Sequence, residues 1–138
     1  MNFNTHTIIA TAAVTILAAL ICIGMTFMVG RARMKAKIPA PAMTGSPELE
    51  CALRVHANTV EQIVIFLPAL WLAALYFQGW SAPILGAIWC VGRILYAITY
   101  TPKTPGKREI GFMLTFLSTV GLVVLTVIGL VQAWGSAA

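Results

Sequence analysis

The chain has 138 residues, of which 59% are hydrophobic and only 9% are charged, and its formal net charge is +5. A soluble domain carries about 25% charged residues, so this chain has too few charged side chains to cover a surface in water. Its mean hydropathy of +0.89 agrees with this. The composition excludes an ordinary soluble domain and predicts a single multi-pass membrane domain over residues 1–138.

Four long apolar segments follow one another along the chain. Each is close to or longer than the ~20 residues that a helix needs to cross ~30 Å of hydrocarbon. The first is too long for the core of a signal peptide and has no basic residue before it, so we expect it to be retained. Backbone polar groups must be satisfied internally in a bilayer, which favours helices. The sequence predicts an all-α membrane protein, a four-transmembrane-helix bundle with spans at about residues 7–29, 52–77, 82–100 and 110–134.

The positive charges cluster in two of the three loops. The first loop holds four cations and the third holds three, whereas the loop near Gln78–Ser81 and both chain ends carry no charged side chain. By the positive-inside rule, the two basic loops face the cytoplasm and both termini face the other side. Topology alone accounts for most of these charges. The seven loop cations are Arg31, Arg33, Lys35, Lys37, Lys103, Lys107 and Arg108.

The second helix is expected to begin before the membrane. Ser46 is a suitable N-cap residue, Pro47 suits the first helical position, and Glu48 places an acid in the first turn. A helix from Pro47 to Phe77 would be about 46 Å long at 1.5 Å per residue. Its first turns therefore lie in the headgroup region or beyond.

Ionisable residues within the second span point to a site. Arg54, Asn58 and Glu61 are spaced i, i+4, i+7, which places them along one face of a helix. Ionised groups at membrane depth cost on the order of 2.5–3.5 kcal/mol each and usually have a function. His56 points to a neighbouring face, where it is either a polar interfacial residue or a ligand contact.

The third span carries a second polar face. Arg93, Tyr96 and Tyr100 are spaced i, i+3, i+7 and approach the same cytoplasmic end, so the two faces can meet. We expect Glu61 to pair with Arg93 or Arg54, because an unpaired buried charge is costly. These residues either tie helices together through interhelical bonds or line a pocket for a small anion with amide groups.

The three cysteines do not indicate a metal site. Cys22, Cys51 and Cys90 show neither CxxC nor Cys/His spacing, and a free thiol in an apolar segment behaves as a small hydrophobe. We expect no metal, no disulfide and no nucleic-acid partner.

The second-helix pattern resembles a known family signature. The run Glu48-Leu-Glu-Cys-Ala-Leu-Arg54-Val-His-Ala-Asn58-Thr-Val-Glu61 is similar to that of the MAPEG family, the membrane-associated proteins of eicosanoid and glutathione metabolism, and in particular to its bacterial microsomal-glutathione-transferase-like members. The family's recurring pattern is Arg-x-x-x-Asn-x-x-Glu at the start of the second span. Arg93 with Tyr96 and Tyr100, then a proline-containing loop and Arg108, is similar to the family's third-to-fourth helix segment.

This resemblance covers essentially the whole chain and implies a function. The expected protein is a homotrimer in a bacterial inner membrane, with glutathione as co-substrate bound between neighbouring subunits near the cytoplasmic face. Arg108 matches the arginine held to stabilise the thiolate, Lys107 is the competing alignment, and Arg33 is a looser match to an arginine near the substrate. The other positions that the resemblance assigns to glutathione are Arg54, His56, Asn58, Glu61, Arg93, Tyr96 and Tyr100.

The leading interpretation is a membrane glutathione transferase for detoxification, which conjugates the thiolate to lipophilic electrophiles and reduces lipid peroxides as a second reaction. Several family members place Tyr directly after the signature Glu, whereas this chain has Gln62, which removes one hydroxyl contact. One alternative is a non-catalytic lipid-binding or scaffold protein of the same family. Another is a small proton-coupled multidrug exporter, which would need Glu61 exposed to its substrate rather than paired with an arginine.

Overall fold

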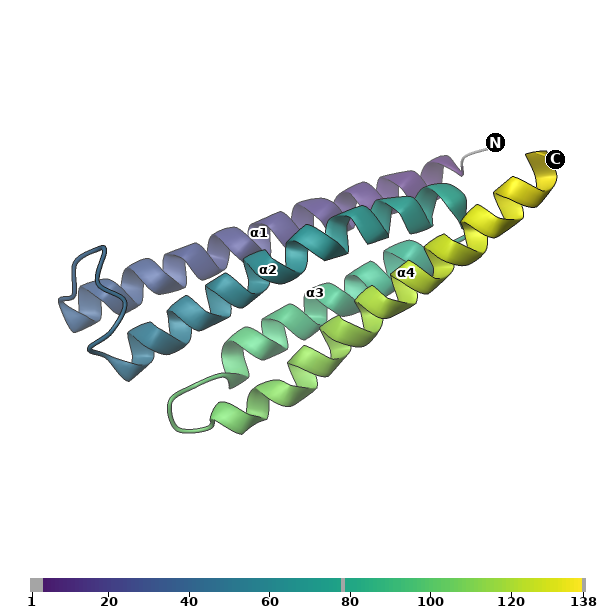
Figure 1. The fold of residues 1–138 in the computed structure, drawn as a ribbon. Coiled ribbons are helices and arrows are strands. Elements are labelled where there is room, and N and C mark those ends of the chain that lie inside the picture. Colours follow the sequence, from purple (N-terminus) through teal and green to yellow (C-terminus); the bar gives the residue numbers. More distant parts are fainter. Residues whose placement is uncertain (1–3, 78, 138) are drawn as a thin grey trace.

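The computed structural model describes residues 4–77 and 79–137, which fold as helices with no strand in those ranges (Figure 1). Gln78 of the expected second loop lies outside the described residues. Four helices are long and apolar enough to cross a membrane, which confirms the prediction of an all-α, four-helix membrane protein. They are α1 (Thr5–Ala36), α2 (Pro47–Tyr76), α3 (Ser81–Thr99) and α4 (Glu109–Ala137), with a short 3-10 turn, η1 (Pro105–Arg108), immediately before α4.

Helix α1 extends well beyond its apolar segment. It continues through most of the first basic cluster and ends at Ala36, where Lys37 takes a left-handed conformation with φ 55°. Arg33 and Lys35 lie in its last turn, where cations interact favourably with the negative end of the helix dipole. Residues that hydropathy assigns to the first basic loop are therefore part of helix α1.

Helix α2 begins where the sequence predicts. The Ser46 hydroxyl accepts a hydrogen bond from the backbone N–H of Leu49 at 3.5 Å, and Pro47 is the first helical residue. Two acids, Glu48 and Glu50, lie in the first turn, where they complement the helix dipole. This cap fixes the start of the helix that carries Arg54.

The helices pack with α2 in contact with all three others, while α1 and α4 each contact α2 and α3. Both termini lie at one end of the bundle, and the two basic loops lie together at the opposite end (Figure 1). In the core, the rings of Phe66 and Trp89 stack 4.0 Å apart at an interplanar angle of 5°, beside buried Leu70 and Leu122. The two basic loops lie at the same end of the bundle, as the expected topology requires. Which side of the membrane they face stays a prediction.

Two glycines bring α3 and α4 very close together near the loop end. A Cβ placed on Gly111 would lie 2.5 Å from the backbone nitrogen of Tyr96 and 2.7 Å from the carbonyl oxygen of Gly92. A Cβ on Gly92 would in turn lie 2.9 Å from Cγ2 of Thr115. Only glycines permit this backbone approach, which sets the start of α4 directly against Tyr96.

Candidate functional site

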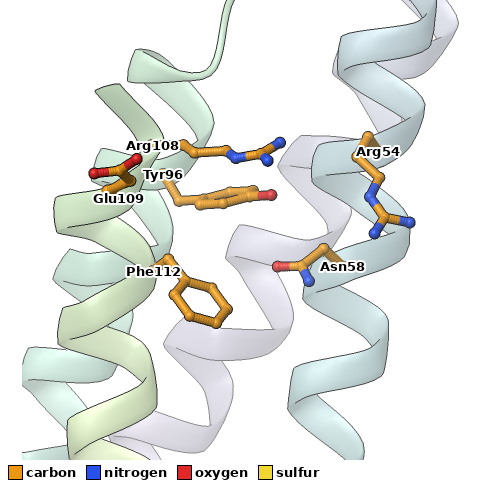
Figure 2. Close-up of a pocket in the computed structure, with 6 residues that line it drawn as sticks. All are labelled: Arg54, Asn58, Tyr96, Arg108, Glu109 and Phe112. Carbon is orange, nitrogen blue, oxygen red and sulfur yellow. The ribbon is translucent and has the colours of Figure 1, made fainter. Parts of the chain in front are cut away.

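A pocket of about 290 Å³ lies at the loop end of the bundle, between α2 and the α3–α4 pair. This volume is near the lower end of the ~300–1,000 Å³ typical of small-molecule sites. Figure 2 shows the α2 side chains on one side of the pocket and the remaining side chains on the other. The lining residues are Arg54, Asn58, Tyr96, Arg108, Glu109 and Phe112.

The α2 side of the pocket is the polar face that the sequence predicts. Arg54 and Asn58 are one helical turn apart, and both line the pocket. Arg54 is exposed, whereas Asn58 is half-buried. The guanidinium is therefore accessible from solvent at the loop end, and the amide lies one turn deeper toward the membrane.

The two polar faces meet through Arg93, which is 0% exposed. Its Nη1 and Nη2 atoms donate to Oδ1 of Asn58 at 3.1 and 3.0 Å, and Nη2 also donates to Oγ1 of Thr59 at 2.8 Å. The expected pairing of Glu61 with Arg93 or Arg54 is wrong for the described part of the chain. Glu61 is exposed because it lies one turn beyond Asn58 and past the reach of this network.

Aromatic side chains connect the buried arginine to the mouth of the pocket. The Arg93 guanidinium carbon lies 4.5 Å from the centre of the Tyr96 ring. The Tyr96 and Tyr100 rings are 5.7 Å apart, and the Arg108 guanidinium carbon lies 4.5 Å from the centre of the Tyr100 ring. Cations over aromatic faces are attracted by about 0.5–2 kcal/mol, so the contact with Tyr100 holds Arg108 at the pocket edge.

The structure separates the two competing cations of the third loop. Arg108 lines the pocket, whereas Lys107 is exposed in η1 and is not among the lining residues. Arg33 donates from Nη1 to the carbonyl of Ala42 and so ties the first loop to α1. It too lies outside the lining.

His56 faces α1 rather than the pocket. Its Nε2 atom is 3.1 Å from Oγ1 of Thr26, which joins α1 and α2. This agrees with the expected position on a neighbouring face. In the described chain, His56 is an interhelical contact.

Three residues of the site are absent from the sequence-based assignment. Phe112 is one turn after Arg108, and this i, i+4 spacing could have indicated that both face the same cavity. Thr59 is adjacent to Asn58, and no motif or spacing in the sequence marks it as a partner of Arg93. Glu109 begins α4, and Figure 2 shows its carboxylate pointing away from Arg54 and Asn58.

The electrostatics of the pocket favour an anion. Arg54 and Arg108 line it, buried Arg93 lies behind it, and Glu109 is its one acidic lining residue. The acceptors of Arg93 are the neutral side chains of Asn58 and Thr59, so its charge is not neutralised by them. Charge–charge interactions are stronger away from bulk water, and a bound anion would therefore be stabilised here.

Comparisons with known proteins agree with this geometry. The profile of the MAPEG family matches residues 11–128. An uncharacterised protein of Synechocystis is 47% identical over 113 residues, which is 82% of each chain. Human microsomal glutathione S-transferase 2 is 38% identical over 123 residues, covering 89% of this chain and 83% of the relative. Leukotriene C4 synthase of Cavia porcellus is 31% identical over 119 residues, covering 80% of this chain and 79% of the relative. The chain therefore belongs to the MAPEG family.

Proposed function

We propose that the protein is a membrane-bound glutathione transferase that conjugates glutathione to lipophilic electrophiles. The observation that carries this proposal is one pocket that gathers Arg54, Asn58, Tyr96 and Arg108 at the basic end of the bundle. The names of two relatives, a microsomal glutathione S-transferase and a leukotriene C4 synthase, support a glutathione-dependent reaction. Reduction of lipid peroxides by the same thiolate is proposed as a second activity.

The pocket supplies what a tripeptide with two carboxylates and a thiol requires. Arg54 at the exposed mouth binds a carboxylate, and Asn58 meets an amide one turn deeper. Arg108 stabilises the thiolate. A free thiol has a pKa near 8.5, and an adjacent cation increases the thiolate fraction at neutral pH.

In the reaction, the thiolate sulfur attacks an electrophilic carbon and forms a carbon–sulfur bond. The leaving group departs with the electron pair of the broken bond, and the proton of the thiol has passed to solvent. The electrophile reaches the sulfur by diffusion within the bilayer. Phe112, the apolar lining residue at the start of α4, provides the surface that it contacts.

We further propose that this single domain functions as a homotrimer, with its basic loops on the cytoplasmic side of a bacterial inner membrane. Glu61 supports an oligomer, because it lies about 20 Å along α2 from Pro47 at 1.5 Å per residue and is exposed on the single subunit. Charged side chains at membrane depth rarely face lipid. A neighbouring subunit would cover Glu61 and bring further residues, such as His56 and Arg33, to a shared site.

The two alternative functions differ in their support. A proton-coupled exporter needs a membrane carboxylate that is not paired with an arginine. Glu61 is exposed, so its position does not argue against an exporter. Membership of the MAPEG family, and not the pairing of Glu61, is what now weighs against an exporter. A non-catalytic lipid-binding or scaffold protein of the family would not bind glutathione, so the experiment below separates it from the enzyme.

The test uses purified protein in detergent. We expect glutathione-dependent conjugation of a chloronitrobenzene electrophile, with chloride released. Arg54→Ala should raise the KM for glutathione by about tenfold, as expected for losing one charged hydrogen bond, whereas Arg108→Ala should mainly lower kcat. Lys107→Ala is the matched control and should retain wild-type activity. Absence of glutathione binding at millimolar concentration in calorimetry would exclude the enzyme.

A further inference from the structure

The side-chain amide of Asn58 is held in one orientation. Its Oδ1 atom accepts two hydrogen bonds from Arg93, at 3.1 and 3.0 Å. An amide oxygen has two lone pairs, and a guanidinium can only donate. The oxygen must therefore face Arg93, and both of its acceptor positions are occupied.

What Asn58 offers to the pocket follows from this inventory. Asn58 lines the pocket, and its Nδ2 group is the polar part that Arg93 leaves available. That group has two N–H donors and no acceptor. Asn58 therefore has only donors left for a ligand, and a ligand that bonds to it must supply an oxygen acceptor.

Arg93 itself is out of reach of a ligand. It is 0% exposed and is not among the described residues that line the pocket. Two residues hold its guanidinium besides Asn58. Thr59 accepts a hydrogen bond from it and donates its own hydroxyl to the carbonyl of Val55 at 2.8 Å. The Tyr96 ring centre lies 4.5 Å from the guanidinium carbon. Arg93 therefore contacts two of the lining residues, Asn58 and Tyr96, from behind.

We propose that Arg93 is a positioning residue, which occupies the Asn58 amide oxygen so that only the N–H donors of that amide remain to bond a ligand, and thereby selects a ligand with a carbonyl or carboxylate oxygen at that point. The assignment rests on the proposed glutathione site and deepens it. It also revises the expectation that Arg93 contacts glutathione directly. Burying a cation against neutral acceptors is costly, and holding a ligand-binding amide in one orientation gives that arrangement a function.

A double-mutant cycle tests the coupling between the two residues. Glutathione binding is measured by calorimetry, and KM and kcat by conjugation, for the wild type, Asn58→Ala, Arg93→Met and the double variant. Each single variant should weaken glutathione binding by about tenfold, as expected for one hydrogen bond to a charged ligand group. The double variant should be no weaker than Asn58→Ala, and kcat at saturating glutathione should change by less than about threefold.

Three further variants separate positioning from folding. Arg93→Lys keeps a cationic donor for Oδ1 but loses the fork that bonds Asn58 and Thr59 together, so it should bind glutathione more tightly than Arg93→Met and less tightly than the wild type. Asn58→Asp would pair with Arg93 but lacks the N–H donors, so it should keep the wild-type unfolding temperature and still lose glutathione affinity. Thr126→Val removes another buried hydroxyl, whose bonds go to Leu122 and Ala69, and should lower stability without changing KM.

The outcomes distinguish the two proposals. If the wild type does not bind glutathione, the proposed function fails. If the wild type binds but the two single effects multiply in the double variant, or if Asn58→Asp binds glutathione normally, the positioning assignment is overturned while the enzyme remains. If Arg93→Met does not fold, the results of Arg93→Lys and Asn58→Asp decide.

Discussion

Replacing Gly111 by alanine should separate two helices and displace half of the pocket. The new Cβ would lie 2.5 Å from the backbone nitrogen of Tyr96, whereas ordinary contacts of a Cβ begin at 3.4 Å. The close neighbours are backbone atoms of Tyr96 and Gly92, which cannot rotate away as a side chain would. We therefore expect α3 and α4 to move apart by roughly 0.9 Å, the difference between these two distances.

The size of the effect follows from two opposing contributions. Overpacking of a close contact destabilises the fold by about 1–3 kcal/mol. Alanine has a higher helix propensity than glycine, which stabilises the helix by about 1 kcal/mol. The net loss of stability should therefore be about 0–2 kcal/mol. Activity should suffer more, because a displacement of about 1 Å can cost on the order of a hundredfold in rate, and Arg108 and Phe112 flank the displaced residue.

The assay combines thermal unfolding in detergent with the conjugation rate, for a graded series on α4. Gly135 has no atom within 4 Å of the added Cβ, so Gly135→Ala should be at least as stable as the wild type and fully active. Gly121→Ala, which meets the flexible Cδ1 of Leu85 at 3.1 Å, should be intermediate. Wild-type stability and activity of Gly111→Ala would refute the described approach of the two helices.

Two further variants probe the pocket and the start of α2. Phe112→Ala removes the apolar lining residue and should raise the KM for the electrophile while leaving the KM for glutathione unchanged; the opposite pattern would mean that Phe112 contacts glutathione. Ser46→Ala removes the N-cap of α2 and should lower the free energy of unfolding by about 1 kcal/mol. Thr44→Ala, outside the cap, is its control, and equal losses in both variants would show that the cap contributes nothing.

Much of the pocket could be predicted because helical periodicity places residues on faces. The i, i+4 spacing brings Arg54 and Asn58 to one side of α2, and the structure has both lining a single pocket. The charge pattern likewise predicts two basic loops at one end, where the structure has them (Figure 1). Local spacing carries this information because it depends only on the geometry of one helix.

The pairing of charges could not be predicted in this way. Periodicity predicted that Glu61 pairs with Arg93 or Arg54, whereas the packing of α3 against α2 brings Arg93 to Asn58. Similarly, Lys107 and Arg108 are adjacent in the chain, and only the stacking of Arg108 over Tyr100 identifies the one at the pocket. Both choices depend on the rotation of one helix relative to another.

The sequence by itself determined the number of helices, the membrane environment and the faces that carry polar residues, because hydropathy and 3.6-residue periodicity are properties of single segments. The tertiary structure alone decided which of those residues line the pocket and which lie behind the lining. The glycine contact between α3 and α4 set the depth of Tyr96 and Phe112. How the helices pack and rotate against one another places Arg93 behind the pocket lining, and no local pattern encodes that packing.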